Sequence, residues 1–374
     1  MKKKWGLLLI LLLSLLPRTA FAAETADAIC IEGETEGLDT DAVDAAAEEM
    51  DAAVSFSDLL AEILSGEFDF TFANIREKAS ELMFGELRMQ GRLLAQLVLI
   101  VILSAILKQC SDSFQGKNVG EMGFYVCYMV LIVAILTSFY SISQSVVERM
   151  RGLCGVFGAM VPIFLVLSAS SGNLAQGALM GPTLMGGVTA LSVGISYVLI
   201  PAIQLSIALE MADHISEKPI LGKFAELLRQ CISWGMKGAA MLFMLLLSLQ
   251  KIGGGALNGL AAKTAKIAVG AVPVVGGVMG GAVETAAAMA GTLKSGTLVA
   301  AVVLLLLLCL PLLIKLLVIL LVFRLTAAAA EFICEERLVE CIAAAGEYIG
   351  LLLGIVFLGE GMFFFSALLL LGGL

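Results

Sequence analysis

The feature that most constrains this chain is a series of long apolar runs that carry almost no charge. The most hydrophobic of them, Leu298–Phe323, is interrupted only by Pro311 and Lys315. A helix needs about 20 apolar residues to cross the hydrocarbon core of a bilayer. Hydrophobic residues make up 60% of the chain and charged residues 15%, whereas roughly a quarter of a soluble domain is charged. The sequence therefore predicts an all-α, polytopic integral membrane protein.

Several other runs have a similar character. In chain order the expected spans are Leu93–Leu107, Met122–Ser143, Leu153–Ser170, Leu184–Leu209, Trp234–Leu249, Leu298–Phe323 and a last one from Gly346 to about Leu371. The segment Ile267–Leu293, which is nearly all Ala, Gly and Val, is either a tightly packed span or a re-entrant hairpin. We therefore expect about 7–8 transmembrane segments after a signal peptide.

Residues 1–22 have the pattern of a secretory signal peptide. Lys2–Lys4 supply the positive start, Gly6–Leu16 is a short apolar core, and Ala20–Ala22 is a small-residue cleavage site. The alternative is an uncleaved anchor, but the apolar core is short for a span. We expect cleavage after Ala22 or Ala23.

The acidity of the chain is concentrated just after this signal. Residues 23–55 hold many Asp and Glu and few large apolar side chains, which predicts a disordered linker. Residues 56–91 read as an extracytoplasmic helical segment, beginning with a short helix from Phe56 to Leu64, and residues 92–374 as the polytopic membrane domain. The Lys/Arg distribution then places the glycine-rich basic loop Lys251–Lys266 on the inner side.

Glycines at helical spacing recur in or beside the apolar runs. The uncharged stretch Ser171–Gly187 is a poor regular helix by composition, and we expect a broken or tightly packed element there. Glycines four residues apart allow helix backbones to approach closely in lipid. The candidate helix-packing or pore residues of this kind are Gly177, Gly181, Pro182, Gly276, Gly277, Gly280, Gly281, Gly346, Gly350 and Gly354.

Ionisable residues inside apolar runs are the other candidates, because a charge at the bilayer centre is costly. Glu284, Lys315 and Glu360 are the residues of this kind that we select. A Lys315–Glu360 pair between neighbouring helices would neutralise both charges. The alternatives are a proton or ion relay, or a side chain that faces a pore.

No pattern in the chain indicates catalysis or a cofactor. The loop Lys251–Lys266 lacks the GxxxxGK[ST] string of a phosphate-binding loop, and neither GxSxG nor HExxH occurs. The single histidine, His214, falls in a stretch read as a solvated polar loop. The eight cysteines form no CxxC, so they indicate neither a metal site nor a disulfide framework. We expect no catalytic residues, no metal, no cofactor and no nucleic-acid partner.

Three strings in combination resemble the stage III sporulation protein AE family of endospore-forming bacteria. They are SFSDLLAEIL in Ser55–Leu64, MFGELRMQGRLLAQLVLIVILSAILK in Met83–Lys108, and VFRLTAAAAEFICEERLVECIAAAGEYIG in Val322–Gly350, followed by GMFFF in Gly361–Phe365. The likeness covers nearly all of the chain.

The resemblance implies a place in sporulation. Members of the family are made in the mother cell and placed in the membrane around the engulfed forespore. They belong to a multi-protein assembly similar to secretion machinery, thought to form a channel that late forespore gene expression needs. The ATPase of that assembly is a different subunit, which fits the missing phosphate-binding loop.

We therefore expect a core membrane subunit of a sporulation-specific transport or channel complex linking mother cell and forespore, and not an enzyme. Its expected partners are other stage III sporulation membrane proteins, membrane lipid and further copies of the same chain. The alternative is a stand-alone ion-coupled secondary transporter, which needs Lys315 or Glu360 to titrate during transport. An intramembrane hydrolase, the third hypothesis, finds no nucleophile in the sequence.

Overall fold

The computed structural model describes residues 40–52, 54–65, 83–113, 117–170, 174–215, 221–270, 276–334 and 336–372. The chain divides into two units, Met1–Gly37 and Leu38–Leu374, of which only the second is described. Its named elements are α2 (Asp41–Glu48), α3 (Phe56–Ser65), α5 (Gly91–Ser113), α6 (Lys117–Ser170), α7 (Leu174–Gly194), the π-helix η2 (Ile195–Leu199), α8 (Ile200–Ile215), α9 (Gly222–Gly270), α10 (Gly276–Ala330) and α11 (Glu336–Gly372). The described residues contain no strand, so the all-α prediction is confirmed for them.

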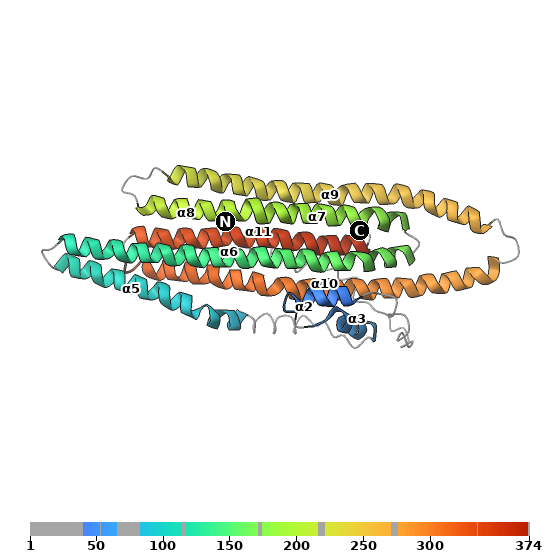
Figure 1. Ribbon diagram of the computed structural model, residues 1–374, viewed down its shortest axis with the longest axis horizontal. Coiled ribbons are helices and arrows are strands. Elements are labelled where there is room, and N and C mark those ends of the chain that lie inside the picture. Colours follow the sequence, from blue (N-terminus) through green and yellow to red (C-terminus); the bar gives the residue numbers. More distant parts are fainter. Residues whose placement is uncertain are drawn as a thin grey trace. The chain divides into compact units, whose positions relative to one another are not determined.

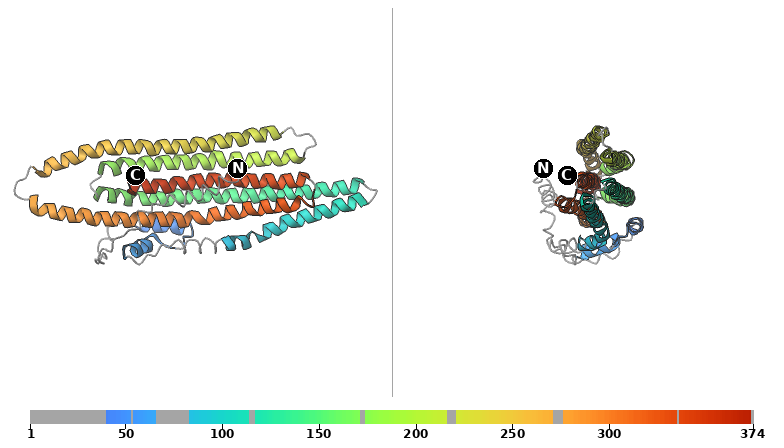
Figure 2. Two further views of the ribbon diagram at one scale, coloured as in Figure 1. Left: turned by 180° about the vertical axis from the view of Figure 1, so that it is seen from behind. Right: turned by 90° about the vertical axis from the view of Figure 1, so that its left-hand side faces the viewer.

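The long helices of the second unit form an up-and-down bundle (Figures 1 and 2). Successive helices run in opposite directions, and α7, η2 and α8 together act as one long rod. Helix α11 is central: it packs most extensively on α10 and also contacts α6, α7 and α8. Helix α9 lies at the edge, against α7 and α8. The interior is filled with Leu, Ile, Val, Phe and Met side chains, so apolar packing of facing helices holds the bundle together.

Helix α6 replaces two of the expected spans with one continuous helix. The expected spans Met122–Ser143 and Leu153–Ser170 belong to one continuous helix of 54 residues, which is about 80 Å long at 1.5 Å per residue. The charged stretch that separates these two expected spans is helical, because Glu, Arg and Met are good helix formers. Among the described residues, five helices are long and apolar enough to cross a membrane, and Ala95–Ile106 is a shorter apolar helix. The count of seven or eight is therefore not confirmed.

The five candidate membrane-spanning segments lie in α6, α7–α8, α9, α10 and α11. Their bounds are Tyr125–Phe164, Thr183–His214, Gly222–Ser248, Gly296–Ala330 and Glu336–Leu368.

The glycine-rich stretch is helical where it is described. Helix α7 is continuous from Leu174 through Gly187, so the broken alternative is wrong for this part, whereas packing of α7 against α6 and α9 agrees with the tightly packed alternative. Leu, Ala and Met between the glycines favour a helix, and packing against α6 and α9 supports it. The irregularity comes later, as the π-helical turn η2. The backbone of Gly177, Gly181 and Pro182 is helical, and their surroundings lie outside the described part of the structure.

The second glycine-rich region joins two long helices. Lys251–Lys266, expected as a loop, is part of α9, and Ile267–Leu293 is divided between the end of α9 and the start of α10. It is therefore not a span of its own. The backbone of Gly276, Gly277, Gly280, Gly281 and Glu284 is helical, and their side chains lie outside the described residues.

Two short helices precede the bundle. Helix α3 agrees with the predicted helix from Phe56, whereas α2 lies in the stretch predicted to be a disordered linker. The difference arises because Val43, Ala47 and Met50 bury apolar surface that the overall acidic composition obscures. Helix α2 packs on α6 and α3 packs on α10.

Specific polar contacts hold these two helices. The Asp44 carboxylate accepts hydrogen bonds from the backbone N–H groups of Phe56 and Ser57, at the start of α3. Arg149 of α6 donates a 2.9 Å hydrogen bond to the carbonyl of Met50, after α2. The acidic segment is therefore attached to the helical bundle at its C-terminal part.

Candidate functional site

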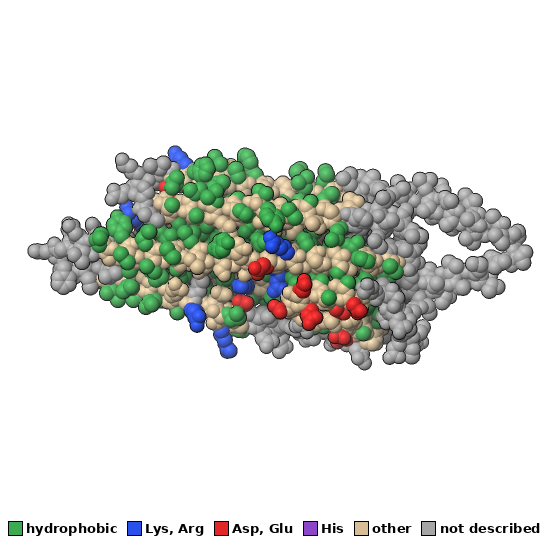
Figure 3. Space-filling view, in the orientation of Figure 1, with side chains coloured by type: hydrophobic (Ala, Val, Ile, Leu, Met, Phe, Trp, Pro, Cys, Tyr) green, Lys and Arg blue, Asp and Glu red, His purple; other side chains and the backbone are tan. Residues whose placement is uncertain are grey.

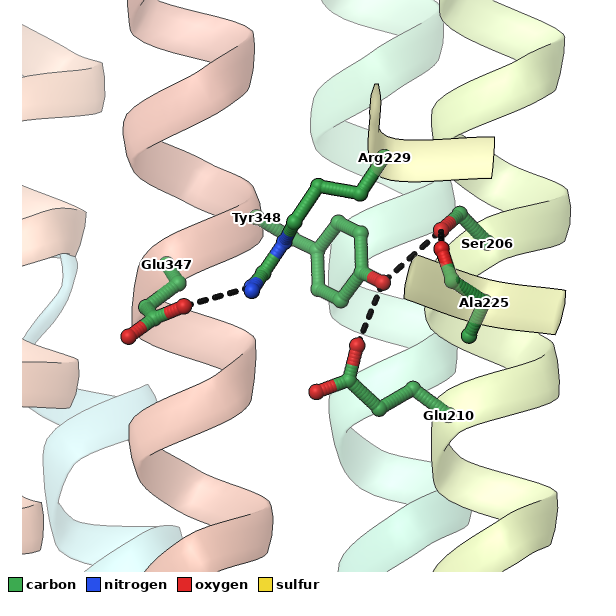
Figure 4. Close-up of polar contacts among 6 residues, drawn as sticks. All are labelled: Ser206, Glu210, Ala225, Arg229, Glu347 and Tyr348. Carbon is green, nitrogen blue, oxygen red and sulfur yellow. Dashed lines mark hydrogen bonds and ion pairs between the residues drawn. The ribbon is translucent and has the colours of Figure 1, made fainter. Parts of the chain in front are cut away.

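A polar network joins α8, α9 and α11 in the otherwise apolar bundle (Figure 4). The Tyr348 side chain of α11 is fully buried. Its hydroxyl donates a 2.5 Å hydrogen bond to a carboxylate oxygen of Glu210 on α8 and lies 2.8 Å from the hydroxyl of Ser206. Ser206 in turn donates to the carbonyl of Ala225 on α9, at 3.2 Å. The buried tyrosine thus finds the polar partners that its hydroxyl requires.

The network is connected through two hydroxyl groups. Three contacts link Ala225, Ser206, Tyr348 and Glu210. Each hydroxyl carries a single donor, so Ser206 and Tyr348 supply two protons. The network therefore ties α8, α9 and α11 to one another through side chains that contact each other directly.

An ion pair and a cation–π contact cover the network. The Arg229 guanidinium of α9 lies 2.5 Å from a carboxylate oxygen of Glu347 on α11 and 5.0 Å from the centroid of the Tyr348 ring. The two charged side chains remain 32% and 58% exposed, and pairs this open contribute about 0–1 kcal/mol. Their effect is to orient Tyr348 and to align α9 with α11.

His214 lies at the rim of the same network. The structure places it in the last turn of α8 and not in a solvated loop, since α8 continues to Ile215. Its Nδ1 is 2.7 Å from the carbonyl of Glu210, and its Nε2 is 3.8 Å from a carboxylate oxygen of Glu340 on α11. Nearby, the Cys341 thiol points to the Met211 sulfur at 3.1 Å. These contacts extend the α8–α11 junction by one more turn.

Glu360 is the second unusual polar group. It is 4% exposed on α11, and neither of its carboxyl oxygens has a hydrogen-bond partner among the described residues. Arg149 of α6 lies near Glu360, but the hydrogen bond that it donates goes to the carbonyl of Met50. A buried carboxyl group without partners is costly, which makes it a candidate for function rather than for stability.

The predicted Lys315–Glu360 pair does not form among the described residues. Contacts of Gly346 with Phe323 and of Gly350 with Leu320 fix the antiparallel register of α10 and α11. Continuing this register places Glu360 opposite the residues near Cys309. Lys315 is therefore more than one helical turn away along the axis.

The glycines of α11 lie at this same α10–α11 contact. A Cβ on Gly346 would lie 3.5 Å from the Cβ of Phe323, and one on Gly350 would lie 3.9 Å from Leu320. These are ordinary van der Waals distances, so the backbones approach without needing glycine at either position. Gly354 is partly buried on the same helix.

Sequence reasoning missed most of the polar network and one exposed charge. Tyr348 was read as part of an apolar run, and Glu210 and Arg229 as part of a polar loop. The available signal was the pair Glu347-Tyr348 at the start of an expected span. Lys237 of α9 was also missed, although it lies inside the expected span Trp234–Leu249.

Comparisons with known proteins agree with the resemblance. Residues 54–373 match the family model described as stage III sporulation protein AE (spore_III_AE). A curated relative, the stage III sporulation protein AE of Bacillus subtilis (strain 168), is 26% identical over 227 residues, which cover 60% of this chain and 57% of the relative. The chain thus matches somewhat more than half of the relative's length. No solved structure matches. Because the family match extends over all the long helices of the bundle, the chain belongs to the stage III sporulation protein AE family.

Proposed function

We propose that the chain is a membrane subunit of a sporulation-specific transport or channel complex that links mother cell and forespore. The family membership supports a role in stage III of sporulation, and five apolar helices support a place in a membrane. In this proposal the chain sits in the mother-cell membrane around the forespore and works with other stage III membrane proteins. It contributes structure to the complex and catalyses no reaction.

The observation that carries this proposal is the packed interior of the bundle. The described side chains that face inward from α6, α8, α10 and α11 form one apolar cluster. A cluster of this kind excludes water and ions, because interiors are packed as densely as organic crystals. A passage would therefore run between chains rather than through one bundle, and that requires an assembly.

A gene deletion in a spore-forming host tests the proposal. We expect cells without the chain to complete engulfment and then to lose late forespore gene expression, measured with a fluorescent reporter in the forespore. A copy supplied from a mother-cell promoter restores the reporter, whereas a copy from a forespore promoter does not. Normal reporter expression in the deletion strain would contradict the proposed role.

Glu360 favours a second candidate, the stand-alone ion-coupled transporter. A buried carboxyl group without partners is the type of residue that transporters use to bind protons. Purified chain in vesicles distinguishes the two functions. Proton-coupled uptake without any other protein supports the transporter, and uptake that appears only with other stage III proteins supports the subunit.

A further inference from the structure

One face of α9 has no partner within the bundle although it is apolar. Only 11% of the apolar window of α9 is buried, compared with 44–61% in the other candidate spans. The exposed side chains form a stripe at alternating spacings of three and four residues, the pattern of a helix–helix seam. The stripe consists of Gln230, Trp234, Lys237, Met241, Met244 and Ser248. Trp234, Met241 and Met244 are each more than 60% exposed.

Lys237 distinguishes this stripe from a surface that only meets lipid. Between Arg229 and Lys251 the sequence has 21 residues, of which Lys237 alone is charged. Such a window measures about 31 Å, the thickness of a bilayer core. Lys237 is eight residues, or about 12 Å, from its nearer end, too far for a lysine stem to reach the headgroups. Among the described residues none forms an ion pair with Lys237. A charge in this position calls for a carboxylate from outside the bundle.

An exposed carboxylate lies at the same height on another face. A Cβ on Gly235 would touch Leu199, which places Lys237 level with Tyr197 because α9 runs antiparallel to α8. Arg151 of α6 donates to the Tyr197 hydroxyl at 3.1 Å. Glu148, one turn before Arg151, is exposed and forms no ion pair with another described residue. Lys237 and Glu148 thus lie within about one helical turn, roughly 5 Å, along the bundle axis.

The middle of the α6 face carries charge where its flanks do not. Charged side chains gather around the middle of α6 and over α2 and α3, while hydrophobic side chains cover the first half of α6 and α5 (Figure 3). Glu148 and Arg151 follow a stripe of exposed apolar residues on α6, which includes Val126, Val133 and Tyr140. The face is therefore apolar with charges at one level, as the α9 stripe is. Glu148 there carries the charge opposite to that of Lys237, and the neighbouring Arg151 is bonded to Tyr197.

We propose that the α9 face of one chain docks on the α6 face of a second copy, with Lys237 paired to the second copy's Glu148, so that copies close into a ring. The inference deepens the proposed function by naming a second copy as the partner, and rests on that function for its place around a passage. In a ring, copies are related by rotation about an axis parallel to the helices, and such a rotation does not shift a residue along that axis. Lys237 of one copy and Glu148 of the next can therefore meet because they lie at the same level of the bundle. A two-fold α9–α9 dimer would instead bring two lysines together and is disfavoured.

Charge reversal in the purified full-length chain tests the ring. Self-association is measured in lipid nanodiscs and detergent by native mass spectrometry and by co-purification of two differently tagged copies. We expect Lys237→Glu and Glu148→Lys each to weaken self-association about tenfold or more, since like charges then face each other. The double variant, which restores opposite charges, should return to within about threefold of the original. Lys223→Glu, an exposed charge reversal at the start of α9, is the matched control and should change nothing.

Cysteine crosslinking keeps the test decisive if a charge variant fails to insert. Met244 and Gly155 are exposed, and each lies seven residues, about 10 Å, beyond Lys237 on α9 and Glu148 on α6 respectively. With Cys231 replaced by Ser, the double variant M244C/G155C should form disulfides between copies on oxidation, and each single variant should form at least tenfold less. Crosslinking should fall when Lys237→Glu is added.

Three outcomes would overturn the inference. The first is a wild-type chain that is monomeric in both media. The second is self-association that is unchanged in both Lys237→Glu and Glu148→Lys. The third is crosslinking only to a different protein or to lipid. None depends on sporulation. A deletion strain with normal forespore expression would remove the proposed function and leave the ring intact, and a monomeric chain would remove the ring alone.

Discussion

Helices α9 and α11 are both long and apolar enough to cross a membrane, and they have opposite environments. Sixty-one percent of the apolar window of α11 is buried inside the bundle, against 11% of that of α9. The polar residues follow the same division: Tyr348 and Glu360 of α11 face protein, whereas Lys237 of α9 faces outward. Hydrophobicity alone therefore identifies both helices as candidate membrane spans. The position of the polar residues separates them: polar groups of α11 lie inside the bundle, whereas the charge of α9 is available for a contact with another molecule.

Removal of a core aromatic ring should have the largest effect on this comparison. Phe363 of α11 is 1% exposed and meets Phe157 of α6 edge to face, with ring centroids 5.8 Å apart. We expect Phe363→Ala to lower the free energy of unfolding by about 3 kcal/mol, because the cavity removes dispersion contacts that lipid cannot replace. Equilibrium unfolding in mixed detergent micelles measures the change.

Trp234→Ala on α9 is the matched control. Trp234 is 64% exposed, so its loss should cost the monomer about 0.5 kcal/mol or less. If Trp234→Ala and Phe363→Ala cost the same in the monomer, α9 is not peripheral and the comparison fails.

Replacement of the carboxyl group buried in α11 should change the free energy of unfolding in the opposite direction. Glu360→Leu is expected to raise the free energy of unfolding by about 1 kcal/mol or more, because a buried polar group without partners is replaced by an apolar one. Glu210→Leu serves as the contrast, since Glu210 accepts a hydrogen bond from Tyr348 and its loss should destabilise.

Sporulation efficiency of cells that carry Glu360→Leu is the second measurement. If the variant is more stable than the wild-type chain but supports less sporulation, Glu360 contributes to activity and lowers the stability of the fold. A loss of stability in Glu360→Leu would show that the carboxyl group has a structural partner, and it would remove the basis for the transporter alternative.

The sequence was sufficient for the class of protein and for part of the fold. Long apolar runs predicted an all-helical protein, and SFSDLLAEIL predicted α3. It was not sufficient for helix continuity. The charged stretch around Glu148 and Arg149 separated two expected spans, because a sequence window cannot show that a single helix continues through both.

The candidate site was harder to predict for a related reason. Glu360 was identified because a charge inside an apolar run is visible locally. Its assumed partner Lys315 was wrong because pairing depends on the register of α10 against α11, which only tertiary contacts fix. Tyr348 and Glu210 are 138 residues apart in the chain, and no local pattern links them.

Loss of one hydroxyl tests the network between α8, α9 and α11. Tyr348→Phe leaves Glu210 without its donor and Ser206 without one contact. We expect a loss of about 1 kcal/mol, near the upper part of the range for hydrogen bonds between membrane helices. Tyr197→Phe, which removes an exposed hydroxyl bonded to Arg151, should change the free energy of unfolding by less than about 0.5 kcal/mol.

Two glycines give the smallest effect and the finest test of the difference between α9 and α11. A Cβ on Gly238 of α9 meets nothing within 4 Å, whereas one on Gly359 of α11 would lie 2.6 Å from the Cε atom of Met150. Gly238→Ala should therefore stabilise the monomer by about 0.5 kcal/mol through helix propensity. At Gly359 the same gain is offset by displacement of the flexible Met150 side chain, so Gly359→Ala should be neutral or destabilising by up to about 1 kcal/mol.

The effect of Gly238→Ala on the free energy of unfolding is most informative when it is measured in two media. It should be stabilising in monomeric micelles and should weaken in nanodiscs that hold assembled chains, where a second copy would meet the added methyl group. A stabilisation of equal size in both media would mean that the α9 face is open in the assembly as well as in the single chain.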